Sequence, residues 1–357
     1  MIEHSHPLIG DPEIAAVERV LRSGRLAQGP EVVAFEEELA SAVGAQHAVA
    51  VANGTVTIEI GLQALGIGPG DEVVVPSFTF IATANAVRRV GATPVFADID
   101  PKTYCLTAAT VEPHVGRDTK AVVAVHLYGH PADMDGLGAL CDERGIHLLE
   151  DAAQGIGASW RGASVGSFGV FASFSFYATK NLTTGEGGML TTSDHRIADI
   201  ARALRSHQSR VVDGRLQVSS NSRMTDIEAA IGRVQLSRMA ELQTRRHQLA
   251  ANYERELRSG LDTPYVAPEA VHGYHQYVVR VPNRESLIRS LELEGVGYGL
   301  YYPVPVHLQD TYRDQPISLH DTETAAREVI SLPIRPDLTD DEQAKVISVV
   351  NQGVGRA

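Results

Sequence analysis

The strongest constraint on the fold is an alternation, between about residues 45 and 190, of short apolar runs with longer amphipathic segments. The runs are rich in Val, Ile and Phe and mostly lack strict polar alternation, which is typical of strands buried on both faces of a parallel sheet. They comprise residues 48–53, 72–76, 93–100, 120–129, 146–151 and 170–177. The segments around 57–66, 81–90 and 134–144 predict crossover helices. We therefore expect an α/β domain, in which ligands bind beyond the carboxyl ends of the strands.

The pattern changes after residue 225. Thr225 to Glu228 has the form of a capping box, and helical periodicity continues to about Leu257. Beyond it, residues 276–281 and 297–304 have strand-like composition, residues 284–295 predict a helix, and a final helix is expected after Leu338-Thr339-Asp340. We predict a large domain over residues 1–240 and a smaller α+β domain over residues 241–357.

Composition limits the class of protein. The chain has 357 residues and a formal net charge of −13, which disfavours a nucleic-acid partner because phosphate backbones need a basic surface. No apolar run approaches the roughly 18 residues of a membrane span, so no membrane partner is expected. The amino terminus lacks a signal pattern, and the two cysteines, Cys105 and Cys141, are expected to be buried thiols. These features predict a cytoplasmic protein.

Residues 51–56 predict a strand that runs through Asn53, Gly54 and Thr55 into a helix. The free N–H groups and the dipole at a helix N-terminus bind anions, and the Thr55 hydroxyl adds a donor. Such turns occur throughout α/β proteins, so a phosphate site and an ordinary turn both remain open on this segment alone.

Two further elements carry ionisable groups next to buried strands. Glu150 and Asp151 end an apolar run, where carboxylates are costly unless a cation or donor meets them; the alternative is a solvated loop. Lys180 lies between an aromatic strand and a glycine-rich turn, without the spacing of a nucleotide-binding P-loop. It is either a surface lysine or one placed for Schiff-base chemistry.

These elements, taken together, resemble a known family. The segments are NGT, GDEVVVPSFTFIATANAV, EDAAQ, FSFYATKNLTTGEGGM and NSRMTDIEAAIGRVQL. They are similar to those of the DegT/DnrJ/EryC1/StrS family of sugar aminotransferases, which use pyridoxal 5′-phosphate (PLP). The similarity extends from SGRLAQGPEVVAFEEELA to ISLPIRPDLTDDE. It implies the aspartate-aminotransferase fold type I, with a mainly parallel seven-stranded sheet in the large domain and a smaller C-terminal α+β domain.

The resemblance also implies roles around the cofactor ring. Lys180 stands where the family's lysine bonds covalently to PLP, and Asp151 stands where an aspartate pairs with the pyridinium nitrogen. These are the expected catalytic residues. Gln154 matches the residue beside the phenolic oxygen, and Phe80 matches the aromatic side chain that stacks on the ring.

The phosphate of PLP is expected at Gly54 and Thr55, with a hydroxyl from Ser175. Asn221 matches an asparagine that in this family reaches the phosphate from the neighbouring subunit. The resemblance therefore implies a homodimer with shared active sites.

The family's reaction moves an amino group, usually from L-glutamate, to a keto sugar by ping-pong steps. The acceptor expected here is a nucleotide-linked keto-deoxysugar, and a keto-inositol is the nearest alternative. Arg223, Tyr302 and His307 match positions near the cleft and are candidate substrate residues. Ser222 replaces the family's usual tyrosine, and a Ser-His-Gln-Ser segment around His207 lacks the usual glycine after the histidine, so the substrate stays open.

Two rival interpretations remain, and a metal site is discounted. In a dehydratase branch of the family a histidine replaces the cofactor lysine, and Lys180 argues against it. A cofactor-binding regulator without turnover has no need for that amine. The histidine pairs His126/His130 and His272/His275 lack a third ligand of metal-site spacing, so no metal is predicted.

Overall fold

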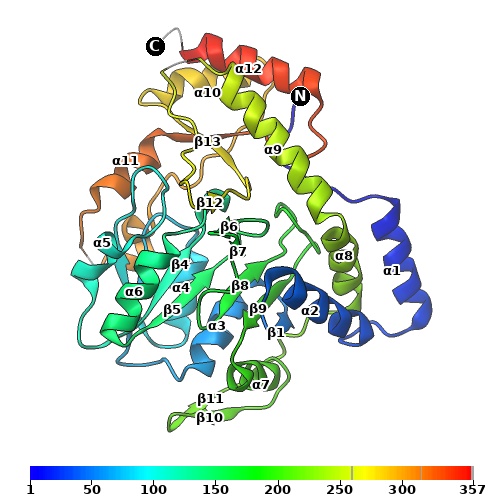
Figure 1. The fold of residues 1–357 in the computed structure, drawn as a ribbon, viewed down its shortest axis with the longest axis vertical. Coiled ribbons are helices and arrows are strands. Elements are labelled where there is room, and N and C mark those ends of the chain that lie inside the picture. The colour runs from blue at the N-terminus through cyan, green and yellow to red at the C-terminus, as the bar shows by residue number, and fades with distance from the viewer. Residues whose placement is uncertain (259, 315, 355–357) are drawn as a thin grey trace.

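The central layer of the molecule is a seven-stranded sheet with the order β1-β9-β8-β5-β4-β2-β3 (Figure 1). The protein is described by a computed structural model over residues 1–258, 260–314 and 316–354. The strands of this sheet are β1 (His47–Val51), β2 (Glu72–Pro76), β3 (Thr93–Ala97), β4 (Thr119–Val125), β5 (His147–Asp151), β8 (Ala172–Ser175) and β9 (Gly188–Thr192). Pairing is parallel from β3 through β2, β4 and β5 to β8, while β9 is antiparallel to β8 and to β1. The predicted mainly parallel sheet is confirmed, and each predicted run contains a strand.

Helices connect and cover these strands. They are α3 (Gly54–Ala64), α4 (Ala82–Arg89), α5 (Ala108–Val111), α6 (Met134–Arg144) and α7 (His195–Leu204). Helix α3 packs on β8 and β9, whereas α6 packs on β4 and β5. The three predicted crossover helices correspond to α3, α4 and α6. Their arrangement leaves the carboxyl ends of β4, β5 and β8 adjacent at one edge of the sheet.

The helical stretch after Thr225 is two helices, not one. Helix α8 (Asp226–Ser237) begins with the predicted capping box, and α9 (Met239–Glu256) follows it. The ladder is interrupted because the Ser237 hydroxyl donates to the Val234 carbonyl at 2.7 Å, while the Arg238 N–H bonds to Gln235. Helices α1 (Asp11–Ser23) and α2 (Pro30–Val43) pack against α8, and Figure 1 shows α9 running from α8 toward α10 and α12.

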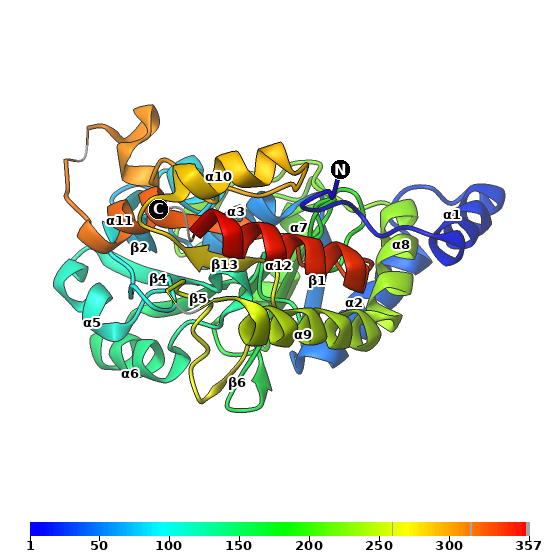
Figure 2. The same ribbon diagram turned by 90° about the horizontal axis from the view of Figure 1, so that it is seen from above.

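The C-terminal part contains a two-stranded antiparallel sheet of β13 (Tyr277–Arg280) and β14 (Val329–Leu332). Around it lie α10 (Arg284–Leu293), α11 (His320–Glu328) and α12 (Asp340–Val354); Figure 2 shows α12 lying across this layer. The strand expected at 297–304 is wrong: Gly299 makes a single bridge to Ser331, and Pro303 and Pro305 have no N–H to extend it.

Smaller elements complete the chain. They are β6 (Ser159–Trp160), β7 (Ala163–Ser164), β10 (Arg210–Val212), β11 (Arg215–Gln217), β12 (Ala270–Val271) and 3-10 turns at Glu112–His114, Leu127–Gly129, Val306–Leu308 and Asp310–Tyr312. None of the helices in the described ranges combines the length and the apolar character that a membrane crossing requires.

Three large hydrophobic clusters form most of the core. The first packs on the central sheet, the second joins α9, α10 and α12 to β13 and β14, and the third packs α2 against β1, β8 and β9. Val306, Tyr312 and Leu319 belong to the first cluster although they follow residue 240. The division into domains 1–240 and 241–357 stays a prediction, and the packing places part of the second range on the large core.

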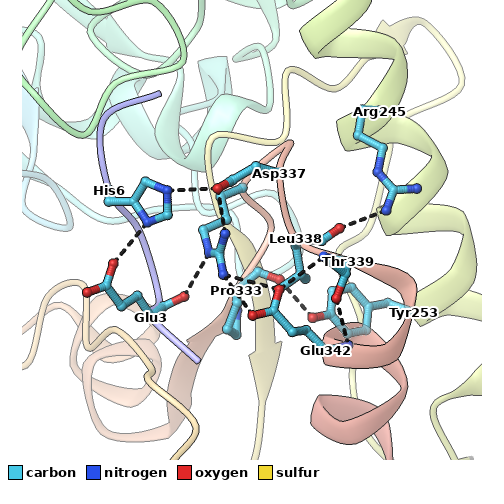
Figure 3. Close-up of polar contacts among 10 residues, drawn as sticks. Glu3, His6, Arg245, Tyr253, Pro333, Asp337, Leu338, Thr339 and Glu342 are labelled. Atoms are coloured by element: carbon cyan, nitrogen blue, oxygen red, sulfur yellow. Dashed lines mark hydrogen bonds and ion pairs between the residues drawn. The ribbon is translucent and has the colours of Figure 1, made fainter. Parts of the chain in front are cut away.

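The first residues of the chain lie on the C-terminal part. Ile2 bridges to Val296, and His6 lies between Glu3 and Asp337, with nitrogen–oxygen distances of 2.9 and 2.8 Å (Figure 3). The guanidinium of Arg335 also reaches Asp337, at 2.7 Å. The amino-terminal segment therefore ties α1 to the layer that contains α12.

Candidate functional site

A cavity of about 1000 Å³ opens where the parallel strands end. Its walls come from the turn between β1 and α3, the loop after β2, the end of β5, the end of β8 with the loop that follows, and residues 301–302. The sequence-predicted residues in this lining are Gly54, Thr55, Phe80, Asp151, Gln154, Ser175, Lys180 and Tyr302. The fold thus brings together side chains that are up to about 250 positions apart, as expected for the carboxyl edge of an α/β sheet.

Asp151 is the last residue of β5 and is 6% exposed. One carboxylate oxygen accepts a hydrogen bond from the Thr83 hydroxyl at 2.8 Å, and the other accepts from the Ala153 N–H at 3.1 Å. A carboxylate has about four acceptor positions, so capacity remains on the cavity side. Asp151 can therefore bind a cationic N–H inside the cavity.

Lys180 lies in the loop after β8, and its side chain lines the same cavity. Burial lowers the pKa of its ammonium group to about 8, and the negative charge of Asp151 opposes this shift. A much larger fraction of this amine is neutral near pH 8 than of an ordinary lysine, because the usual pKa is 10.5. The amine is suited to act as a nucleophile and as a proton carrier.

The turn before α3 forms an anion cradle. Asn53 caps the helix by accepting from the Val56 N–H at 3.0 Å, and the hydrogen bonds among the described residues leave the N–H groups of Gly54 and Thr55 without a partner. Ser175 lies against this turn, since a Cβ on Gly54 would stand 2.9 Å from the Ser175 Cβ. Free N–H groups at a helix N-terminus with hydroxyls beside them suit a phosphate.

The turn reaches this position because a glycine lies behind it. A Cβ on Gly188 of β9 would stand 2.4 Å from the carbonyl carbon of Asn53, so only glycine permits the approach. Ser173 of β8 adds a hydrogen bond from its hydroxyl to the Gly54 carbonyl at 3.1 Å. Strands β8 and β9 therefore fix the cradle relative to Lys180.

Gln154, Tyr302 and Phe80 form the remaining wall. The Gln154 side chain accepts from the Tyr128 N–H at 2.7 Å and donates to the Tyr302 hydroxyl at 3.0 Å. Phe80 is 56% exposed, and its ring centroid is 6.0 Å from that of Tyr302. Such an exposed aromatic ring at a cavity wall offers a stacking surface for a planar ligand.

Comparison with known proteins decides the family. Residues 7–351 match the sequence profile of the DegT/DnrJ/EryC1/StrS aminotransferase family. The chain belongs to this family. It is an aminotransferase with the fold of the PLP-dependent enzymes, and its cofactor is PLP.

Two curated relatives act on nucleotide-linked sugars by name. The chain is 41% identical over 348 residues to a dTDP-3-amino-3,4,6-trideoxy-α-D-glucose transaminase from Streptomyces venezuelae, covering 96% of this chain and 92% of the relative. It is 39% identical over 359 residues to a UDP-N-acetyl-3-dehydro-α-D-glucosamine 3-aminotransferase from Acidithiobacillus ferrooxidans, covering 98% and 95%. The relatives support transamination of a sugar, and they differ in nucleotide and in sugar.

A solved structure shows the same arrangement of the chain. DesV from S. venezuelae, in complex with a ketimine intermediate, superposes with a TM-score of 0.92 at 40% identity and covers 97% of this chain and 95% of its own. The expected fold type is confirmed by this agreement.

The cavity of this aminotransferase fits PLP on its own geometry. The unpartnered N–H groups of Gly54 and Thr55 suit the phosphate, and Asp151 retains acceptor capacity for the protonated ring nitrogen. Lys180 supplies an amine of lowered pKa for the aldehyde. The chemistry of the donor set matches each polar end of the cofactor.

Three sequence-predicted residues lie outside this cavity. Asn221 is exposed and bridges to Ser206, and Arg223 bridges to Val51 at the end of β1. His307 is 2% exposed, and its ring and backbone bond to the Ser77 hydroxyl at 2.6 and 3.0 Å. Within one chain, these three residues are not among those that line the cavity, and their functional roles stay predictions.

The ring nitrogens of the first histidine pair, His126 and His130, are hydrogen-bonded within the protein. The two ring nitrogens of His126 bond to Glu150 and to the Ala132 N–H, and those of His130 bond to Pro131 and Ala267. Across the described residues, no group of three or more His, Cys, Asp or Glu side chains is arranged to hold a metal ion.

Sequence reasoning missed several residues of the cavity. Thr83 holds Asp151, and Asn53 shapes the cradle. Glu59 and Arg89 also line the cavity, and their side chains form an ion pair. Asn53 could have been found as a helix N-cap, because Asn is a preferred residue there. No local signal indicates Thr83, Glu59 or Arg89, because their partners lie 68 and 30 positions away in the chain.

Proposed function

We propose that this aminotransferase transfers the amino group of L-glutamate to the keto group of a nucleotide-linked deoxysugar. The observation that carries the proposal is a cavity of about 1000 Å³ beside Lys180 and Asp151. This volume is at the upper end of the range of about 300–1000 Å³ for small-molecule sites. It leaves space for an acceptor larger than an amino acid, and both relatives named above act on nucleotide-linked sugars.

When bound, PLP supplies an electron sink for the carbon that gains or loses a proton. In our proposal Lys180 would hold the cofactor through its amine, and the same amine, once free, would carry the proton to or from the donor carbon. Its lowered pKa favours this exchange near neutral pH. Asp151 keeps a proton on the ring nitrogen, and Thr83 and Ala153 orient its carboxylate.

The other residues bind and orient. Gly54, Thr55 and Ser175 would bind the phosphate, and Phe80 would stack on the ring. The Tyr128 N–H holds Gln154 so that its amide NH₂ group donates to the Tyr302 hydroxyl. From there Gln154 would also bind the phenolic oxygen of PLP. We place the keto sugar on the outer side of Phe80 and Tyr302.

We also propose a homodimer in which Asn221 of one subunit binds the phosphate in the other. The exposure of Asn221 and its position outside its own cavity support this arrangement. Asn221→Ala should weaken PLP binding by about 10-fold to 100-fold, as expected for loss of a hydrogen bond to a charged group. Unchanged PLP affinity in this variant, or a fully active monomer in sedimentation, would contradict the shared site. A cytoplasmic location remains our expectation, consistent with the free thiols of Cys105 and Cys141.

The function is tested by the two half-reactions. The purified protein should be yellow, and borohydride should attach the cofactor to Lys180, as read by peptide mass spectrometry. L-Glutamate should convert the bound cofactor to its pyridoxamine form. Nucleotide-linked 3-keto and 4-keto deoxysugars, and keto-inositols, are then added separately while the PLP absorbance is followed.

Return of the PLP absorbance with a nucleotide-linked keto sugar, and not with a keto-inositol, is the expected result. Response to a keto-inositol alone would replace the acceptor in our proposal. A protein that takes up no PLP would overturn the site assignment.

A further inference from the structure

The lining of the cavity includes an ion pair between two helices. Glu59 lies on α3, Arg89 is the last residue of α4, and both line the cavity. Their side chains meet with an Nε to Oε1 distance of 2.5 Å. The Glu59 side chain is 15% exposed, whereas that of Arg89 is 67% exposed. The guanidinium is therefore held at one edge by a largely buried carboxylate, while the rest of it is exposed on a residue that lines the cavity.

Few cations line this cavity. The charged lining residues in the described part of the chain are Glu59, Arg89, Asp151, Lys180 and Glu186. His275 also lines it, but burial lowers the pKa of His275 well below its usual value, so its ring is neutral near pH 7. Under the proposed function Lys180 and Asp151 serve the cofactor. Arg89 is then the one cation among the described lining residues that is left for an anionic substrate.

We propose that Arg89 binds the diphosphate of the nucleotide-linked substrate and that Glu59 pairs with its guanidinium until the substrate displaces it. This inference rests on the proposed function. A guanidinium presents paired N–H donors that match two phosphate oxygens, and it stays charged at any physiological pH. The diphosphate is the only strongly anionic part of such a substrate, so its binding selects nucleotide-linked sugars over free keto sugars and keto-inositols.

Moving the Arg89 guanidinium from Glu59 to a diphosphate should cost the protein little free energy of folding. An ion pair with one partner so exposed contributes little to stability, so redirecting Arg89 loses little. Burial raises the pKa of Glu59 and the charge of Arg89 opposes that shift. When Arg89 turns toward a diphosphate, Glu59 can take up a proton more readily than an exposed carboxylate.

Arg88 provides a matched control on the same helix. Its guanidinium donates to the Thr311 carbonyl, lies 5.3 Å from the centre of the Tyr312 ring and is 3.9 Å from Asp314. Arg88 is outside the cavity lining. Removal of its charge changes the net charge of α4 as much as removal of Arg89 does, so the two variants separate direct binding from a general electrostatic effect.

The experiment measures equilibrium binding to the PLP-loaded enzyme by calorimetry. The probes are dTDP, UDP, the matching monophosphates and the nucleosides alone. Arg89→Gln should weaken diphosphate binding by about 10-fold to 100-fold and leave nucleoside binding unchanged. Arg88→Gln should stay within about twofold of wild type. Glu59→Gln should tighten diphosphate binding severalfold, because the guanidinium is released from its carboxylate.

Kinetics give a second measurement. Arg89→Gln should raise the KM of the nucleotide-linked keto sugar by a larger factor than the KM of L-glutamate, while Arg89→Lys should recover part of the affinity. Thermal melting of each variant confirms that it folds.

Two results in an enzyme that accepts nucleotide-linked sugars would overturn this inference and leave the proposed function standing. The first is an Arg89→Gln variant that binds diphosphates as tightly as wild type. The second is an Arg88→Gln variant that loses as much diphosphate affinity as Arg89→Gln. A wild-type enzyme that binds neither dTDP nor UDP and aminates only a keto-inositol overturns the proposed acceptor as well.

Discussion

Glu150 and Asp151 are neighbours on β5, yet their carboxylates lie in two different environments. Glu150 faces a closed cage, where it accepts hydrogen bonds from the N–H groups of Gly166, Phe168 and Gly169 at 2.7–2.8 Å and contacts His126 at 3.0 Å. Asp151 faces the cavity with two donors, from Thr83 and Ala153. Successive strand residues point to opposite faces, so adjacent residues of the same chemistry reach different sites.

The difference shows that the role of a carboxylate depends on how many of its hydrogen-bond acceptor positions the protein leaves free. Glu150 has each oxygen occupied by protein donors, so it holds the loop at 166–169 against the sheet and has nothing left for a ligand. Asp151 keeps acceptor capacity on the cavity side. We infer that Glu150 serves stability and Asp151 serves catalysis, and the following predictions test this division from the largest effect to the smallest.

Lys180→Ala should cause the largest loss of turnover. Loss of the amine removes both the covalent attachment and the proton carrier, so turnover should fall by about 10⁴-fold. The free energy of unfolding of the cofactor-free protein should change by less than about 1 kcal/mol, because the side chain lines a cavity and is not part of the hydrophobic core. Single-turnover absorbance and urea unfolding measure the two quantities. Substantial activity in this variant would contradict the role of Lys180.

Asp151→Asn should lower turnover by about 10³-fold, because a neutral amide cannot hold the proton on the ring nitrogen. The unfolding free energy should fall by only about 1–2 kcal/mol. The amide keeps the shape of the carboxylate and one acceptor oxygen for the Ala153 N–H, and the Thr83 hydroxyl can turn to accept from the amide NH₂ group. The steady-state rate and urea unfolding are compared in the same preparation. An Asp151→Asn variant that loses stability and keeps its turnover would contradict the division of roles between Asp151 and Glu150.

Glu150→Gln should have the opposite profile. Removal of one partner of a buried pair costs about 3–5 kcal/mol, so unfolding should shift strongly while turnover per folded molecule stays within a few-fold of wild type. Burial alone would raise the pKa of Glu150, but hydrogen bonds from His126 and the backbone lower it below 4.5. Its contribution is therefore present above pH 4.5 and is lost as the pH falls through the folded-state pKa. Acid unfolding of wild type and variant measures this difference.

The pH dependence of PLP uptake sharpens the comparison. The Lys180 amine must be neutral to attack the aldehyde, so the uptake rate of cofactor-free protein should fall about tenfold per pH unit below its pKa of about 8 and level off above it. Asp151→Asn should move this midpoint to lower pH, because the opposing charge is gone. Glu150→Gln should leave it in place. A rate that keeps rising to pH 10 would indicate a lysine of ordinary pKa.

Phe80→Leu should give the smallest effect. Phe80 is 56% exposed at the cavity wall, whereas Phe78, two positions earlier, is fully buried. Loss of the stacking ring should weaken PLP binding by about 3-fold to 10-fold with little change in stability. Phe78→Leu is the matched control and should lower stability while keeping PLP affinity. Spectrophotometric titration and thermal melting give both values, and reversed profiles would contradict the stacking role.

Much of the fold could be predicted because its signals are local. Each apolar run contains a strand of the sheet, and the capping box at Thr225 begins α8. The break at Arg238 and the missing strand at 297–304 were not predicted, because they depend on single hydroxyl and proline effects within otherwise regular patterns. Strand β9 was not identified as a separate run, although it lies between β1 and β8 and carries the glycine that admits the Asn53 turn.

The sequence by itself determined which chemistry is available: a lysine, an aspartate and a glycine-threonine turn at the ends of buried strands, in motifs that indicate a PLP enzyme. Only the tertiary structure decided how these groups are used. It placed Thr83 against Asp151, enclosed Glu150 in a cage, joined Glu59 to Arg89, and put His307 behind the cleft against Ser77. The physical reason is the separation along the chain over which each interaction acts. Hydrophobic periodicity and capping act over a few residues, whereas the partners of a buried polar group come from distant segments that meet only when the core packs.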